Sequence, residues 1–310
     1  MNILPRFAVL LAAFNGLDFI RAQIDSILVQ DNVSVQIFIS VDQSSDGTEE
    51  FLIGFSSHEP RITLLPFGFH FGGAGPNFYH LISNVDFSSF DYVSFADQDD
   101  VWTVDKLIRA HHVLTSGRAQ GYSSNFIAFW PDGFRLPVKK SYPQRRWDFI
   151  FESAGPGCTY VIGPDLCLAL KQFILQSGKD LYEVEFHDWL IYAYARFHGY
   201  LWIIDDSYSI EYRQHSNNQL GVNFGWRSFV LRLKKILNGY GIGQSLLIAN
   251  LIGANSADII QRGLLGGRLG YVWLSFQCFA CRRKIIDRMM FFISCLLLAI
   301  VNPLRPPSTK

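Results

Sequence analysis

The chain has 310 residues, 49% of them apolar and 17% charged, which is enough for a sizeable core in one large domain or in a catalytic domain with an appendage. Five cysteines are too few for a disulfide scaffold and indicate a reducing, cytoplasmic compartment. The net charge of zero hides an asymmetry, because residues 226–310 contain 12 Lys and Arg against 2 Asp and Glu, whereas the first 225 residues contain 15 against 25. We therefore expect an acidic catalytic part at 1–225 and a basic, apolar part at 226–310.

Strands and helices alternate over the first hundred residues. Apolar runs predict buried strands at 7–13, 35–41, 62–65 and 92–96, with helices near 18–28, 49–55 and 77–83. The first run has no cleavage site after it, so we interpret it as a strand and not as a secretion signal. Alternation of this kind implies a mainly parallel sheet whose loops gather at the carboxyl ends of the strands.

Two of these strand ends are acidic. One acidic loop begins at Asp42, and the other carries Asp97, Asp99 and Asp100, followed by Trp102, which we expect to be a packing residue. Carboxylates are rarely buried without a partner, so the second cluster needs a cation or a shared proton. Hard divalent cations such as Mg²⁺ or Mn²⁺ take oxygen ligands and keep positions open for substrate phosphates. The alternative is a solvated acidic turn that caps the following helix.

The middle of the chain is less regular but delivers three further polar candidates. Asp188 lies at the start of a helix predicted at 186–196, where an ordinary first-turn carboxylate is the alternative interpretation. Strands predicted at 201–204 and 209–213 lead to Arg213 and His215. Arginine suits phosphate oxygens and neutral histidine can bind a metal, although a hydrogen-bonded strand end would look the same.

The C-terminal part combines basic residues with apolar helical segments. The apolar run at residues 289–301 has only 13 uncharged residues before Asn302-Pro303, whereas a membrane-spanning helix needs about 20. We therefore expect this part to lie on the anionic inner face of the cytoplasmic membrane, the alternative being a helical subdomain with a basic surface. Cys278 and Cys281 form a single C-x-x-C without a second pair, so no zinc site is expected.

Five motifs in this order resemble a family 2-type glycosyltransferase with the GT-A fold, and more narrowly the bacterial rhamnosyltransferase-like branch used in cell-surface polysaccharide assembly. They are residues 10–16 (LLAAFNG), 40–48 (SVDQSSDGT), 95–102 (FADQDDVW), 187–189 (HDW) and 212–218 (YRQHSNN). The resemblance covers about residues 5–225. It implies an α/β fold of the GT-A type, with a mainly parallel mixed sheet flanked by helices, and leaves the rest as a C-terminal helical appendage.

The resemblance also implies roles for the residues that bind the donor nucleotide. The family's counterpart of Asp42 contacts the nucleotide base, and the loop that contains Ala13 and Asn15 lines the nucleoside pocket. Asp97 belongs to the D-x-D pair and touches the ribose and the metal. Many relatives carry Asp-Asp where this chain has Val41-Asp42, so a dTDP donor is favoured over UDP or GDP only by the branch.

The remaining roles concern the metal and the chemistry. Asp99, the second member of the D-x-D pair, is the nearer metal ligand by analogy, with Asp100 as a further candidate. The late motif brings His215 to the metal and Arg213 to the donor diphosphate. Asp188 matches the catalytic base, because inverting transfer needs a group that removes the proton of the acceptor hydroxyl. Gly157, Cys158 and Thr159 resemble the wall on the acceptor side, and Asn77 could approach the donor.

The resulting hypothesis is an inverting, metal-dependent transfer of a sugar, L-rhamnose from dTDP-rhamnose, onto a lipid-linked glycan such as O-antigen. The cofactor is Mg²⁺ or Mn²⁺, and we expect no nucleic-acid partner. One alternative is a nucleotidyltransferase or sugar-nucleotide hydrolase, which would need a basic cluster near the first loop, where only Arg21 is found. The other is a non-catalytic, membrane-associated carbohydrate-binding subunit that would use Trp102, Trp130 and Trp189 as stacking platforms.

Overall fold

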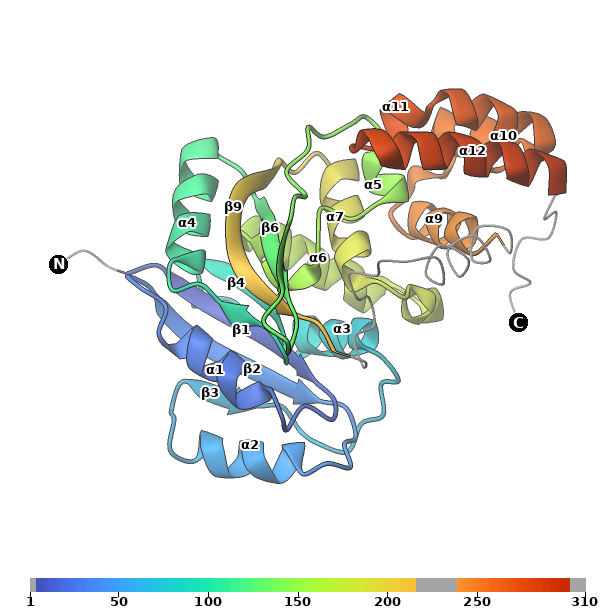
Figure 1. The fold of residues 1–310 in the computed structure, drawn as a ribbon. Helices are drawn as coiled ribbons and strands as arrows, with labels where there is room; N and C mark the ends of the chain where they lie inside the picture. The colour runs from blue at the N-terminus through green and yellow to red at the C-terminus, as the bar shows by residue number, and fades with distance from the viewer. Residues whose placement is uncertain (1–3, 216–238, 302–310) are drawn as a thin grey trace. The chain divides into compact units, whose positions relative to one another are not determined.

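The computed structural model describes residues 4–215 and 239–301 (Figure 1). The chain divides into two compact units. Unit 1 contains residues 1–141 and 154–219, and unit 2 contains residues 142–153 and 220–310. The sequence did not indicate that residues 142–153 group with the C-terminal part. The predicted boundary between residues 225 and 226 falls outside the described residues and stays a prediction.

The first half of unit 1 is a parallel sheet in the order β3-β2-β1-β4. Its strands are β1 (Arg6–Ala13), β2 (Ser34–Val41), β3 (Ile62–Leu64) and β4 (Tyr92–Asp97). All of β1 after its first residue is buried, as expected of a central strand covered on both faces. The register pairs Ala13 with Val41 and Ala12 with Asp97, so the loops that follow β1, β2 and β4 begin at the same edge.

The second half of the sheet is largely antiparallel. β8 (Val161–Ile162) joins β4 to β6 (Gly121–Phe129), both in antiparallel pairs, and β6 also pairs with β7 (Arg135–Val138). β9 (Trp202–Arg213) runs parallel to β6 and antiparallel to β5 (Val101–Trp102). Figure 1 shows β9 as a long, curled strand. The predicted fold class, a mixed α/β sheet flanked by helices, is confirmed.

The helices of unit 1 connect the strands. They are α1 (Ile20–Leu28), α2 (Thr48–Ser56), α3 (Ala74–Asn84), α4 (Lys106–Gly117), α6 (Pro164–Gln176) and α7 (His187–Phe197), with short 3-10 turns at Gly157–Thr159 and Lys179–Glu183. Pro164 occupies the first turn of α6, where its missing N–H costs nothing. α1 begins after Phe19 and has no side-chain cap.

Unit 2 consists of helices in its described part. They are α5 (Asp148–Phe151), α9 (Tyr240–Leu251), η3 (Ala254–Ser256), η4 (Ile259–Leu264), α10 (Gly267–Phe276), α11 (Cys278–Cys281) and α12 (Ile285–Val301), the last four drawn in orange to red in Figure 1. Glycines let α10 approach η4 closely, since a Cβ on Gly270 would lie 2.5 Å from the carbonyl oxygen of Gly263. Among residues 4–215 and 239–301, no helix is both long enough and apolar enough to cross a membrane.

A buried ionic cluster ties residues 142–153 to the C-terminal helices within unit 2. The Arg283 side chain is 4% exposed and its Nε lies 3.5 Å from Glu152 Oε1 and 3.8 Å from Asp148 Oδ2. Arg283 N–H also donates to Glu152 Oε1 at 2.7 Å, and Arg282 Nη1 donates to the carbonyl oxygen of Phe151 at 2.6 Å. Two of the basic residues of the C-terminal part, Arg282 and Arg283, therefore bind other residues of unit 2.

Candidate active site

Asp42 organises the loop that follows β3. Its amide donates to the carbonyl oxygen of Ala13 at 2.8 Å, which fixes the end of β2 against the end of β1. Its buried carboxylate accepts hydrogen bonds from the amides of Gln43, Phe71 and Gly72, each at 2.9 Å. The side chain predicted to contact the nucleotide base thus lies at the predicted edge and also shapes the loop beside it. Its role toward a base stays a prediction.

The loop predicted to line the nucleoside pocket is anchored to the loop after β2. Asn15 has a φ of +45°, a backbone region that asparagine tolerates better than most residues. Its amide donates to Ser44 Oγ at 3.0 Å, and its Oδ1 accepts from the amide of Ser45 at 2.8 Å. The amide of Gly16 donates to Thr48 Oγ1 at 2.9 Å. Asn77 is buried, and its Nδ2 donates to the carbonyl oxygen of Ser40 at 3.2 Å; its approach to the donor stays a prediction.

The predicted metal group and the late motif meet at the ends of β4 and β9. His215 Nε2 lies 2.7 Å from Asp99 Oδ2, so two of the three predicted metal ligands are in contact. Arg213 Nε donates to the carbonyl oxygen of Asp99 at 3.0 Å, and its guanidinium lies between the rings of Phe19 and Phe129. Phe19, which was not predicted from the sequence as a site residue, also stacks on His215 with ring centroids 4.9 Å apart.

The third predicted ligand, Asp97, lies beside Asp100 and Cys158. One ligand atom from each of these three residues lies within 4.8 Å of the other two. Asp100 is 1% exposed, and its Oδ2 has no hydrogen-bond partner among the described residues. Burial raises the pKa of Asp97, and the charges of Asp99 and Asp188 raise it further. Burial likewise raises the pKa of Asp100, with Asp99 and Asp97 adding to the effect.

These observations fit a hard divalent cation. Burial together with the charges of Asp100 and Asp97 raises the pKa of the Cys158 thiol, so the sulfur stays protonated and is a poor ligand. The carboxylate oxygens of Asp97, Asp99 and Asp100 remain, one of them an oxygen without a partner, and such an oxygen set suits Mg²⁺ or Mn²⁺. A bound cation would favour the ionised forms of Asp97 and Asp100, whose pKa values burial raises.

Asp188 comes to the same place from α7. It lies in the first turn of this helix, and its charge raises the pKa of both Asp97 and Tyr79, so its carboxylate lies near the acidic cluster. Gly157 provides the space, because a Cβ there would lie 2.4 Å from His187 Nε2 and 3.3 Å from Asp188 Cβ. The structure therefore brings the predicted base, the predicted metal group and the expected acceptor-side loop together in unit 1.

Lys106 also belongs to this region and was not predicted from the sequence. Lys106 is fully buried, its Nζ donates to Ser94 Oγ at 2.9 Å, and it lies 3.5 Å from the ring centroid of Trp102. Burial lowers the pKa of Lys106 to about 7, although the nearby Cys158 and Asp100 favour its charged form. Trp102 is 4% exposed, in agreement with the expected packing role. A lysine four residues after the acidic cluster and its tryptophan is the signal that could have revealed this contact.

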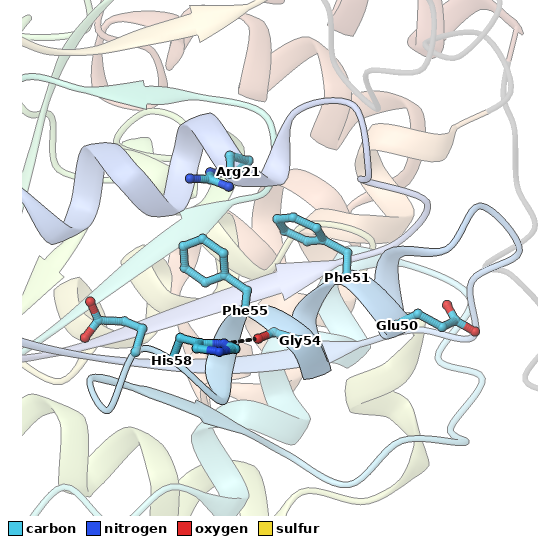
Figure 2. A pocket seen from close by; sticks show the side chains of 7 residues that line it. Arg21, Glu50, Phe51, Gly54, Phe55 and His58 are labelled. Carbon is cyan, nitrogen blue, oxygen red and sulfur yellow. Dashed lines mark hydrogen bonds between the residues drawn. The ribbon is translucent and has the colours of Figure 1, made fainter.

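A shallow pocket elsewhere in unit 1 contains none of the predicted site residues. It is formed by α1, α2 and the turn after α2 (Figure 2), and Arg21, Phe55 and His58 are among the residues that line it. Arg21 lies over the Phe55 ring at 5.2 Å and contacts Asp25 at 3.3 Å. The pocket has no cluster of carboxylates, so the edge with Asp42 and Asp97 is the candidate active site.

Comparison with known proteins identifies the family. A model of glycosyl transferase family 2 matches residues 8–172. The chain is 38% identical to the dTDP-rhamnosyl transferase RfbG of Shigella flexneri over 291 residues, which cover 93% of this chain and 99% of that protein. The chain belongs to glycosyl transferase family 2. The predicted resemblance to this family and to its rhamnosyltransferase-like branch is confirmed, and the protein is a glycosyltransferase.

Other relatives agree with this assignment. The UDP-Glc:alpha-D-GlcNAc-diphosphoundecaprenol beta-1,3-glucosyltransferase WfgD of Escherichia coli is 30% identical over 179 residues, 56% of this chain and 66% of that protein. Staphylococcus aureus TarS in complex with UDP-GlcNAc gives a TM-score of 0.53 at 12% identity, covering 95% of this chain and 90% of that chain. The mannosyltransferase PcManGT of Pyrobaculum calidifontis, in complex with GDP-Man and Mn²⁺, gives 0.52 at 14%, covering 96% and 86%. The solved structures support the fold, and the family membership sets aside the hydrolase, nucleotidyltransferase and non-catalytic alternatives.

Proposed function

We propose that this glycosyltransferase moves L-rhamnose from dTDP-rhamnose onto a lipid-linked glycan during the assembly of a cell-surface polysaccharide such as O-antigen. The observation that carries the donor assignment is the 38% identity to a dTDP-rhamnosyl transferase across nearly the whole of both chains. The acidic site in unit 1 supports the metal dependence, and the Mn²⁺ complex of the mannosyltransferase PcManGT, which has the same fold, agrees with it.

The proposed reaction is a single inverting displacement. The acceptor hydroxyl attacks the anomeric carbon, its proton passes to the carboxylate of Asp188, and the bond from that carbon to the dTDP oxygen breaks. The helix dipole of α7 favours the ionised carboxylate that this role needs, since Asp188 lies in the first turn. Gly157 keeps the space beside Asp188 open.

The other residues bind the donor. A divalent cation held by Asp97, Asp99 and Asp100, with His215 beside Asp99, would offset the negative charge that grows on the leaving diphosphate. Asp42 and the loop with Ala13 and Asn15 line the nucleoside pocket. Arg213 turns its guanidinium toward the diphosphate, held in position by the two aromatic rings that flank it.

We further propose that unit 2 holds the enzyme at the inner face of the cytoplasmic membrane. Its described part exposes many large apolar side chains between residues 265 and 301, among them Leu269, Phe276 and Met289, which are 84%, 67% and 62% exposed. Arg262, Arg268 and Lys284 are exposed in the same unit. Apolar side chains accompanied by basic ones favour the interface of an anionic bilayer. A lipid-linked acceptor would then be presented to the enzyme at that surface.

A donor panel tests the reaction. Purified enzyme, a lipid-linked acceptor and Mg²⁺ or Mn²⁺ are supplied with dTDP-rhamnose, UDP-glucose or GDP-mannose, and nucleotide release and product configuration are measured. We expect release with dTDP-rhamnose only, loss of release with EDTA, and a product of inverted anomeric configuration. Transfer from none of the donors would refute the proposal.

A pair of variants tests the base. Asp188→Asn should abolish transfer while dTDP still binds, because the amide cannot accept the proton of the hydroxyl. Asp165→Asn is the matched control, since Asp165 is also a first-turn carboxylate of a helix but is exposed on α6. If Asp188→Asn transferred rhamnose as fast as Asp165→Asn, Asp188 would not be the base.

A further inference from the structure

Gln98 separates the two aspartates of the D-x-D pair and has no part in the proposed chemistry. Its side chain nevertheless makes two hydrogen bonds to one residue of the first loop. Oε1 accepts from the amide of Phe14 at 2.7 Å, and Nε2 donates to the carbonyl oxygen of Phe14 at 2.8 Å. An amide side chain has one acceptor and one donor end, so it can satisfy the backbone of another residue as a neighbouring strand does.

This contact begins where the backbone pairing ends. The ladder between β1 and β4 has its last pair at Ala12 and Asp97. Beyond that pair the two strands turn into separate loops, one containing Asn15 and the other containing Asp99. The Gln98 side chain therefore continues the connection between β1 and β4 past the end of the sheet.

Gly16 is fitted to this contact. A Cβ on Gly16 would lie 2.4 Å from Gln98 Oε1 and 2.7 Å from its Cδ, so the amide occupies the space that a side chain would need. Gly16 is not among the residues with positive φ. The close approach of Gln98, and not the backbone conformation, is therefore the reason for glycine at this position.

The opposite side of the same loop is also fixed. Asn15 and Gly16 are bound by Ser44, Ser45 and Thr48 of the loop after β2, as described above. The loop from Phe14 to Gly16 is thus bonded on one side to Ser44–Thr48 in the loop after β2, and on the other side to Gln98 in the D-x-D loop. Gln98 is therefore a direct side-chain link between the D-x-D loop and the nucleoside loop.

We propose that Gln98 is a positioning residue that couples nucleoside binding to metal binding. A cation that orders the D-x-D loop also orders the loop of Asn15 through Gln98, and nucleoside bound at Asn15 orders the metal ligands in return. By linkage, each ligand tightens the other by the same factor, which for such couplings is about 5–150-fold. The inference rests on the proposed function, because it takes these two loops as the nucleoside and metal sites.

The test needs a ligand that cannot touch the metal. In dTDP the phosphates would bind the cation directly and produce coupling without Gln98, so the probe is thymidine, which carries no phosphate. Its dissociation constant is measured by ligand-observed NMR with and without saturating Mg²⁺, for the wild type, Gln98→Leu and Gln36→Leu. Gln36, on β2, is the control, because its side chain donates an exposed hydrogen bond to Thr63 Oγ1 on β3 at 3.0 Å and contacts neither loop.

We expect Mg²⁺ to tighten thymidine binding at least about fivefold in the wild type and in Gln36→Leu, and to leave it unchanged in Gln98→Leu. Gly16→Ala, which displaces the amide from the other side, should remove the coupling in the wild-type background and change nothing further in Gln98→Leu. The thermal unfolding of each variant is measured to detect a general loss of structure. If Gln98→Leu does not fold, Gly16→Ala serves as the test variant in its place.

Wild-type coupling in Gln98→Leu, or an equal loss of thymidine affinity with and without Mg²⁺, would overturn the inference. Both results leave the proposed function intact as long as dTDP-rhamnose is still a donor for the wild type. If the wild type bound neither dTDP nor Mg²⁺, the proposed function would fail, and this inference with it.

Discussion

His187 provides a prediction about acid stability that depends on one buried ring. The side chain is 8% exposed, its ring stacks on Phe78 with centroids 4.0 Å apart, and Nε2 has no hydrogen-bond partner among the described residues. Burial lowers the pKa of His187 from 6.5 to about 3. The ring is therefore neutral in the folded protein throughout the range in which it becomes protonated in the unfolded chain.

The sign and the size follow from proton linkage. Below pH 6.5 the unfolded chain binds a proton at His187 that the folded protein does not, so acid favours the unfolded state. At pH 5 the solution is about 1.5 pH units below the pKa of His187 in the unfolded chain, whereas at pH 7.5 the residue is neutral in both states. Each of these pH units changes the unfolding free energy by about 1.4 kcal/mol. The wild type should lose about 2 kcal/mol of unfolding free energy from this residue over that range.

The comparison variant is His187→Gln, which keeps a polar side chain that does not titrate. Urea unfolding of both proteins is followed by tryptophan fluorescence at pH 7.5, 6.5 and 5. The contributions of the carboxylates near α7 are common to both proteins and cancel in the difference. We expect the difference in unfolding free energy to shift by about 2 kcal/mol in favour of the variant as the pH falls. Parallel pH profiles would refute the reasoning.

Three further predictions concern other parts of the molecule. Arg283→Met should lower the unfolding free energy by about 3–5 kcal/mol in urea titrations, because it removes the buried counter-charge of two carboxylates, whereas the exposed Lys284→Met should change it by less than about 0.5 kcal/mol. Gly157→Ala should lower kcat about 100-fold without weakening dTDP binding, because the new Cβ pushes the start of α7 away. Gly178→Ala is the control and should leave kcat unchanged, since a Cβ there meets nothing within 4 Å; equal kcat values for the two variants would contradict this. Phe276→Asp should reduce flotation with anionic vesicles while Val29→Asp, at a similarly exposed site in unit 1, leaves it unchanged, and equal flotation would argue against the membrane face.

The parallel half of the sheet could be predicted because its strands are continuous apolar runs. β9 could not, since Asp205, Asp206 and Ser207 interrupt the pattern and made one strand look like two. These polar residues remain in the strand because other elements satisfy them. Arg109 Nε donates to Asp205 Oδ2 at 2.6 Å, and Asn125 Nδ2 donates to the carbonyl oxygen of Asp206 at 2.9 Å. The partners lie 81 to 96 residues away in the chain, beyond the reach of a local pattern.

The candidate site divides in the same way. The acidic strand ends at Asp42 and Asp97 follow from local pattern, because parallel strands end at one edge. The prediction that His215 lies near Asp99 and Asp188 near Asp97 came from the family resemblance. The local sequence pattern does not relate residues that are so far apart in the chain. The contact of Phe19 with His215 and the two bonds from Gln98 to Phe14 needed three-dimensional coordinates.

The grouping of residues 142–153 with unit 2 has a consequence for folding during synthesis. Glu152 and its partner Arg283 are separated by 131 residues, which a ribosome adds in roughly 6 to 26 seconds. For the first part of that interval, until α9 (Tyr240–Leu251) has been made, Phe149 and Ile150, buried in the finished protein, have none of the C-terminal helices to cover them. In a chain shortened to its first 225 residues, Phe149 and Ile150 would stay exposed permanently. Expression of the catalytic part alone therefore calls for polar residues at these positions as well as for the truncation.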